Sequence, residues 1–225
     1  MSYLIYLAII ILVPIYAQLK VRGAYNKFSK VYSSSGMTGA QVARKILNDN
    51  GLYHVSVEEV GGFLSDHYDP RTKTVRLSSA NYHGHSLAAT AVAAHEVGHA
   101  IQDQQNYAFL RFRHALVPVA SIGSNFAWVL IMIGIFAQAS GMLLLGIIFM
   151  ASAVLFQVIT LPVEFNASSR AMDQVIASGI IRNDEERETK KVLNAAALTY
   201  VAAAAVAVLE LVRLILIYTG MTREE

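Results

Sequence analysis

The chain has 225 residues, of which 55% are hydrophobic and only 15% are charged, against roughly 25% charged residues in an ordinary soluble domain. This composition is typical of a membrane protein, and a net charge of +2 without Lys or Arg interleaved with aromatic residues argues against a nucleic-acid partner. The absence of cysteine excludes disulfides and thiolate metal ligands, so a zinc ion would have to be bound by His and carboxylate side chains.

The first predicted element is an apolar segment over residues 3–19, which is followed at once by Lys20 and Arg22. We interpret it as a transmembrane helix. A cleaved signal peptide is the alternative, but no Lys or Arg precedes the apolar run and no Ala-x-Ala site follows it.

Residues 20–114 are predicted to form a catalytic segment with mixed α+β structure. Thr38 and Gln41 form a capping box, which predicts a helix over residues 38–50 that ends at Gly51.

Two extended runs follow, over residues 63–68 and 73–78, and the turn residues between them predict a β-hairpin. We expect the second run to be an edge strand that pairs with an extended peptide and binds it through Val75, Arg76 and Leu77.

The motif His-Glu-x-x-His occupies residues 95–99, on a helix predicted to span about 86–102. Residues at positions i and i+4 share one helix face, so His95 and His99 can bind one metal ion while Glu96 lies beside them as a general base. Short motifs of this kind also arise by chance, so the rest of the chain must support the interpretation. Within the motif, Gly98 allows a strand or substrate to approach closely, or serves only helix packing.

A catalytic zinc ion takes three protein ligands and leaves one position for water. Gln105 occupies the position at which longer zinc motifs place a third histidine, so this ligand must come from elsewhere. Glu164 is the leading candidate because it opens a polar segment directly after an uncharged one. The alternative is a carboxylate that only marks the end of a membrane helix.

Residues 115–163 contain no charged side chain. As one helix this segment would be about 73 Å long at about 1.5 Å per residue, too long for a single crossing of a roughly 30 Å membrane core. We therefore predict two transmembrane helices, over 115–137 and 141–163, joined by a turn near 138–141. An even number of crossings returns Glu164 to the side of the membrane that carries the two histidines.

The remaining chain is predicted to form a cytoplasmic helix and loop over 164–191, which supplies the third ligand, and a fourth transmembrane helix over 192–218. Glu210 and Arg213 lie three residues apart in this last helix, where they can pair with each other.

The distribution of positive charge predicts the orientation. Eleven Lys and Arg residues lie between Lys20 and Arg113, five lie between Arg170 and Lys191, and none lies before the first apolar segment or in the 138–141 turn. Both positively charged segments are therefore expected in the cytoplasm.

Other polar residues are candidates for supporting roles. Arg170 is a candidate oxyanion stabiliser, and His83 with His85 form either a second metal site or a polar loop. Three acidic residues are candidate partners for the ligand imidazoles, a role that metal-bound histidines usually require: Asp66, Asp69 and Asp173.

Four segments together resemble the bacterial membrane proteins of the YugP-type neutral zinc metallopeptidase family, namely residues 66–70, 75–78, 95–99 and 162–168. The resemblance covers nearly the whole chain. The resemblance implies a zinc-dependent peptidase of the cytoplasmic membrane, with His95, His99 and Glu164 as ligands and Glu96 as base. The layout is also distantly similar to HtpX-type proteases, whose ligand helix reads Glu-x-x-x-Asp. Here Ser168 occupies the Asp position, so that carboxylate is absent.

We therefore predict a mainly α membrane protein with about four transmembrane helices and a small cytoplasmic α+β unit of gluzincin type. The predicted function is an endopeptidase that uses a zinc-activated water and one Zn²⁺ per chain, with a role in membrane-protein quality control or processing. Its expected partners are a peptide or membrane-protein substrate and the lipid bilayer, and a homo-oligomer or regulatory membrane partner is left open. The alternatives are a scaffold with a structural zinc site and, last, a metal transporter.

Overall fold

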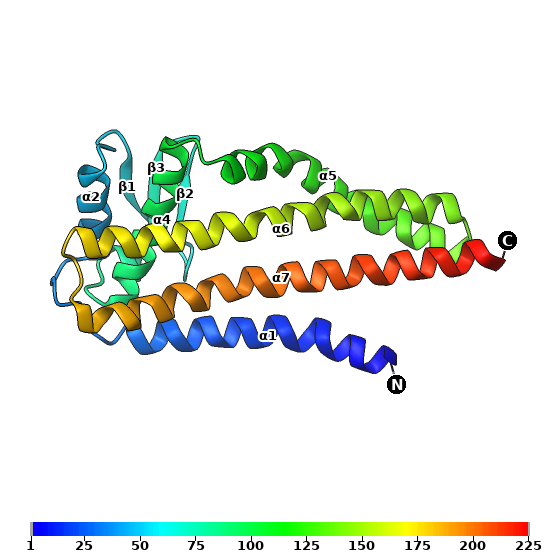
Figure 1. The fold of residues 1–225 in the computed structure, drawn as a ribbon, viewed down its shortest axis with the longest axis horizontal. Helices are drawn as coiled ribbons and strands as arrows, with labels where there is room; N and C mark the ends of the chain where they lie inside the picture. Colours follow the sequence, from blue (N-terminus) through cyan, green and yellow to red (C-terminus); the bar gives the residue numbers. More distant parts are fainter. Residues whose placement is uncertain (1, 225) are drawn as a thin grey trace. The chain divides into compact units, whose positions relative to one another are not determined.

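A computed structural model describes residues 2–224 and divides the chain into two compact units. The apolar unit contains residues 1–14, 108–162 and 200–225, and the site unit contains residues 15–107 and 163–199. The elements follow in the order α1 (Ser2–Phe28), α2 (Gly39–Asp49), β1 (Ser56–Val60), β2 (His67–Asp69), β3 (Thr74–Ser78), α3 (Ser79–Tyr82), α4 (Leu87–Gln104), α5 (Ala108–Phe136), α6 (Ser140–Ala177) and α7 (Asn183–Glu224) (Figure 1).

The sheet of the site unit has the strand order β1-β3-β2. β2 and β3 pair antiparallel, which confirms the predicted hairpin, although its first strand covers residues 67–69 and not 63–68, because 63–66 form a bend and an irregular segment. β1 pairs parallel with β3 from Ser56↔Thr74 to Val60↔Ser78. The expected edge position of β3 is therefore wrong. β3 is the central strand, and Val75 and Leu77 are fully buried in it, so they do not offer a free edge to a peptide.

The core of the site unit forms where α4 packs against α2 and the sheet. The capping box that begins α2 is confirmed: the Gln41 backbone N–H donates to Thr38 Oγ1 at 3.2 Å, and the Thr38 N–H donates to Gln41 Oε1 at 2.9 Å. Most of α4 is buried and alanine-rich, which lets other backbone segments approach it closely. The core is built from large apolar side chains of α2, β3 and α4, including Ile46, Leu47, Leu77, Leu87 and Ile101.

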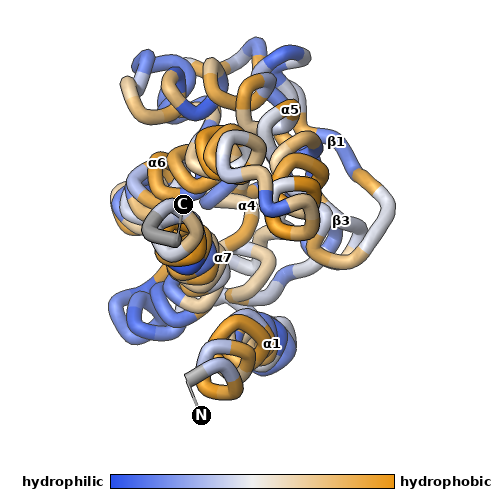
Figure 2. Tube along the Cα trace, turned by 90° about the vertical axis from the view of Figure 1, so that its right-hand side faces the viewer, coloured by the Kyte–Doolittle hydropathy of each residue, from blue (hydrophilic) through white to orange (hydrophobic). Residues whose placement is uncertain are grey.

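Within the described residues 2–224, four helices are long and apolar enough to cross a membrane, namely α1, α5, α6 and α7. Figure 2 shows the hydrophobic residues along them. In the apolar unit, α5 ends at Phe136 and α6 begins at Ser140, which confirms a turn in the uncharged segment. A Cβ atom on Gly134 would lie 2.5 Å from the Leu143 backbone nitrogen, so the two helices approach closely beside this turn.

All four long helices extend beyond the predicted membrane segments: α1 continues past residue 19 to Phe28, and α5 begins at Ala108 rather than near residue 115. α6 continues without a break through Glu164 to Ala177, and α7 begins at Asn183 rather than near residue 192. The membrane boundaries stay predictions, because a helix can continue past the edge of a bilayer. Within α7, Arg213 pairs with Glu210 as expected, and its guanidinium also lies 4.9 Å from the ring centroid of Tyr6.

Candidate metal centre

The centre is built where α4 and α6 pack against each other within the site unit. Ser86 begins α4 by accepting a hydrogen bond from the Ala89 N–H at 3.1 Å. A Cβ atom on Gly98 would lie 2.6 Å from the Ala167 carbonyl oxygen of α6, so only glycine permits this separation of the two backbones. Gly98 is therefore a packing glycine between the helix that carries the histidines and the helix that carries Glu164.

The side chains of His95, His99 and Glu164 converge. Glu164 Oε2 lies 3.2 Å from His95 Nε2 and 3.5 Å from His99 Nε2, and the three ligand atoms all lie within 4.8 Å of one another. Two ligand atoms bound tetrahedrally to zinc at about 2.1 Å are separated by about 3.4 Å. The two distances to Glu164 match this spacing, and two imidazoles with a carboxylate are a donor set that zinc prefers.

The burial of Glu164 also favours the ligand role over that of a helix-end marker. Only 2% of this residue is exposed. A buried carboxylate is costly unless it is paired or bound to a metal, and the two imidazoles are the groups beside it.

In each of the two histidines, the ring nitrogen Nδ1 contacts a neutral side chain. His95 Nδ1 lies 3.2 Å from Ser168 Oγ, and His99 Nδ1 lies 3.0 Å from Gln102 Oε1. Hydrogen bonds at this position fix the tautomer and ring orientation of a metal-binding histidine. Ser168 therefore occupies the position of the missing carboxylate with a hydroxyl group. Gln102 was not predicted from the sequence, although its spacing three residues beyond His99 places it on the same helix face.

Glu96 lies beside the two histidines and is 8% exposed. Burial raises the pKa of its carboxyl group to about 7, while the charge of His95 and a hydrogen bond from the Tyr68 backbone N–H act in the opposite direction. A divalent cation bound nearby would also favour the charged carboxylate. The hydrogen bond from Tyr68 places the strand β2 next to Glu96.

The acidic residues proposed as imidazole partners have other contacts. Asp66 accepts hydrogen bonds from Ser78 and Asn81, and Asp69 accepts them from Arg71, Thr72 and Arg76. These bonds organise the hairpin and the start of α3. Asp173 is exposed.

Arg170, His83 and His85 form hydrogen bonds with residues outside the three-ligand cluster. The Arg170 guanidinium donates to Asn166 and Gln105, and its oxyanion role stays a prediction. His83 lies 3.1 Å from Glu59, whereas His85 contacts the Gly36 carbonyl oxygen, which favours a polar loop over a second metal site.

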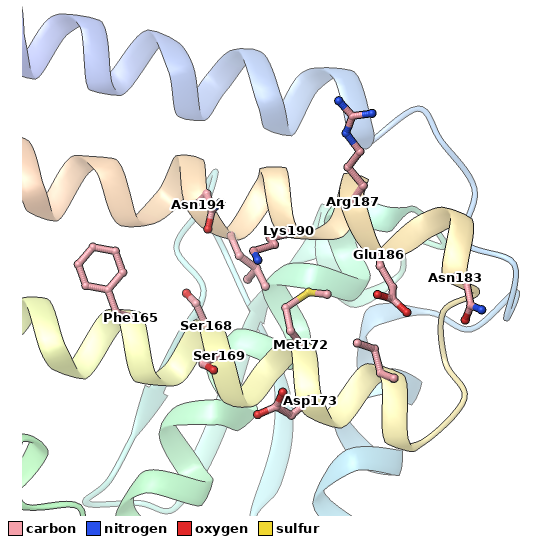
Figure 3. Close-up of a pocket in the computed structure, with 12 residues that line it drawn as sticks. Phe165, Ser168, Ser169, Met172, Asp173, Asn183, Glu186, Arg187, Lys190 and Asn194 are labelled. Carbon is pink, nitrogen blue, oxygen red and sulfur yellow. The ribbon is translucent and has the colours of Figure 1, made fainter.

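A cavity of about 620 Å³ lies between α6 and α7 within the site unit (Figure 3). Ser168 lines this cavity and also contacts His95, so the cavity adjoins one ligand of the candidate centre. Its lining combines apolar side chains with charges of both signs, including Phe165, Met172, Asp173, Leu193 and Lys190.

Residues 3–219 match the protein family described as "putative neutral zinc metallopeptidase". The chain belongs to this family. A relative in Bacillus subtilis (strain 168), the "putative membrane protease YugP", is 52% identical over 203 residues and is matched over 90% of each chain. No solved structure matches the chain. Membership in this metallopeptidase family supports a protease role and implies zinc, for which His95, His99 and Glu164 offer a site.

Proposed function

We propose that this chain is an integral membrane zinc endopeptidase of gluzincin type. The observation that carries the proposal is the convergence of His95, His99 and Glu164 beside the buried carboxylate of Glu96. Among residues 2–224, the cluster offers three ligands. Catalytic zinc sites usually have three protein ligands and keep one position open, whereas structural sites usually have four. This difference favours an enzyme over a scaffold with a structural zinc site.

Glu96 is the proposed general base. When bound at this site, zinc supplies Lewis acidity that polarises the peptide carbonyl group and lowers the pKa of water to about 7. The Glu96 carboxylate accepts a proton from the attacking water and passes it to the nitrogen of the leaving amine. The Tyr68 backbone beside Glu96 lowers the pKa of this carboxyl group and so favours its charged form, while Ser168 and Gln102 contact Nδ1 of the two imidazoles.

An extended peptide is the substrate class that the site supports best. β2 is an edge strand of the sheet, and its Tyr68 backbone lies near enough to Glu96 to lower the pKa of that carboxyl group. A peptide that pairs with this edge would have its backbone next to the general base. The substrate role expected of β3 is therefore transferred to β2. The cavity between α6 and α7 has a volume within the usual range for ligand sites, about 300–1,000 Å³, and could hold a substrate side chain.

The enzyme is proposed to lie in the cytoplasmic membrane with its active site facing the cytoplasm, as the Lys and Arg distribution predicts. Such a site acts on cytoplasmic segments of membrane proteins, which is consistent with quality control or processing.

The substitution Glu96→Gln tests the proposal. Purified full-length protein in detergent is expected to bind one zinc ion per chain in both forms, because Glu96 is not a ligand. Cleavage of fluorescein-labelled casein, and any self-cleavage, is expected to fall about 10²–10⁴-fold in Glu96→Gln, the usual contribution of general acid–base catalysis. Zinc is measured by elemental analysis and cleavage by fluorescence.

Glu59→Gln is the matched control, because Glu59 lies on the same unit but its side chain is 43% exposed and pairs with His83. Its activity is expected to equal that of the unmodified protein. Equal cleavage by Glu96→Gln and the unmodified protein would contradict the proposed mechanism, and a chain that binds no zinc would contradict the metal site itself.

A further inference from the structure

A buried amide on α4 connects the candidate ligand His99 to the backbone of α6. Gln102 is fully buried, and its Nε2 group donates to the Val163 carbonyl oxygen at 2.8 Å and to Asn166 Oδ1 at 2.9 Å. The carbonyl oxygen of Val163 can only accept, so it must face the NH₂ group of Gln102. The amide oxygen of Gln102 is thereby left to face His99 Nδ1.

Arg170 fixes the other end of this chain of hydrogen bonds. Its Nε donates to Asn166 Oδ1 at 2.7 Å, and its Nη1 donates to Gln105 Oε1 at 2.6 Å. Because a guanidinium group can only donate, it holds the Asn166 side chain with its oxygen toward both Arg170 and Gln102. The Arg170 guanidinium also lies 5.9 Å from the ring centroid of Tyr107, a cation–π contact that restricts it further.

We propose that Gln102 is a positioning residue for the metal site, and that Arg170 sets its orientation through Asn166. The amide oxygen of Gln102 accepts the hydrogen of His99 Nδ1, so the lone pair of His99 Nε2 faces Glu164 and the metal. The inference rests on the proposed function in that it takes the metal to be the zinc ion of the peptidase.

The contacts explain why glutamine, rather than glutamate, suits this position. A glutamate at residue 102 would still accept from His99, but its second oxygen would face the Val163 carbonyl oxygen and Asn166 Oδ1. Three acceptors would then meet in a buried space where the Gln102 NH₂ group no longer donates between them, and Arg170 Nε already donates to one of them, Asn166 Oδ1, so the substitution is costly. Gln102→Glu is thus expected to disturb the site although it supplies His99 with a carboxylate partner.

The test compares Gln102→Met and Arg170→Met with Gln104→Met in the full-length protein. Methionine keeps the length and volume of the side chain without its hydrogen bonds. Gln104 lies on the same helix but is exposed, so it serves as the matched control. Two measurements that do not depend on activity are made: Zn²⁺ affinity, by competition with a chromophoric chelator, and the absorption spectrum of bound Co²⁺.

Gln102→Met is expected to bind Zn²⁺ about 10–100-fold more weakly and to change the Co²⁺ spectrum, the usual consequence of losing a group that orients a ligand. Arg170→Met is expected to weaken binding in the same direction by a smaller factor, and Gln104→Met to leave both measurements unchanged. A purely structural role would lower thermal stability but leave the Co²⁺ spectrum of the folded protein unaltered.

Wild-type affinity and spectrum in Gln102→Met would overturn the assignment. Should that variant fail to fold, wild-type affinity and spectrum in Arg170→Met would overturn it. Failure of the unmodified protein to bind zinc would instead contradict the proposed function, so the two outcomes are distinguishable.

Discussion

At the residue scale, the candidate centre holds both imidazoles with neutral groups. Ser168 contacts His95 through a hydroxyl group, and Gln102 contacts His99 through an amide. A carboxylate partner makes a metal-bound imidazole more basic than a neutral partner does. Within the described contacts, the negative charge beside the histidines therefore comes from Glu164 and Glu96. Replacing a neutral imidazole partner with a carboxylate is expected to raise the zinc affinity.

The substitution Ser168→Asp is expected to tighten zinc binding by about 10–100-fold, because it supplies His95 with a carboxylate partner. Ser168 lines the cavity between α6 and α7, so there is space for the longer side chain. Zinc affinity is measured by chelator competition. The same change is expected to lower the thermal stability of the zinc-free protein, because it brings a third carboxylate near Glu96 and Glu164.

Ser169→Asp is the control for this prediction, because Ser169 is exposed and lines the same cavity. It is expected to leave zinc affinity unchanged. An equal gain in both variants would show that the effect comes from general negative charge and not from a hydrogen bond to His95.

At the scale of elements, the sequence predicted local structure well and long-range pairing poorly. The helix α2 and the β2–β3 hairpin follow from capping and turn residues that lie close together in the chain. β1 was missed because its sequence, Ser-Val-Glu-Glu-Val, lacks a clear apolar alternation, and its pairing with β3 is set by the packing of distant segments. Without β1, the central strand β3 was mistaken for an edge.

In the candidate site, too, the features that depend on local spacing could be predicted better than the contacts between distant segments. The proximity of the two histidines on α4 could be predicted because their spacing is local. Glu164 could be predicted beside them because an even number of predicted crossings would return it to the same side. The bond between Gln102 and His99 also lies within one helix, but its purpose becomes clear only from the contacts of Gln102 with Val163 and Asn166.

The close packing of α4 on α6 predicts the effect of Gly98→Ala. The added Cβ atom would lie 2.6 Å from the Ala167 carbonyl oxygen, so the helices must separate. Overpacking of this kind usually costs about 1–3 kcal/mol of unfolding free energy. Zinc affinity is expected to fall as well, because the histidines lie on α4 and Glu164 on α6. Thermal unfolding in detergent and chelator competition measure the two effects.

Gly23→Ala is the matched control, since Gly23 is a helical glycine whose Cβ position has no atom within 4 Å. Alanine favours helix over glycine by about 1 kcal/mol, so this change is expected to preserve or raise stability. Unaltered stability and zinc affinity in Gly98→Ala would contradict the role of this glycine in bringing the ligands together.

At the scale of the whole molecule, the number of membrane crossings determines whether the ligands can meet. The histidines precede α5, Glu164 lies in α6, and the turn at residues 137–139 separates these two apolar helices. If both helices cross the membrane, the segments that flank them lie on one side, and the positive charges predict that this side is the cytoplasm.

This orientation can be tested by cysteine labelling, because the natural chain contains no cysteine and each introduced thiol is therefore unique. Ala137→Cys lies in the exposed turn between α5 and α6, whereas Tyr53→Cys and Asp184→Cys lie at exposed positions of the site unit. A membrane-impermeant maleimide is expected to label Ala137→Cys in intact cells and to label the other two variants only after permeabilisation. The reverse pattern would place the site outside the cytoplasm, and labelling of all three variants in intact cells would mean that α5 and α6 do not cross the membrane.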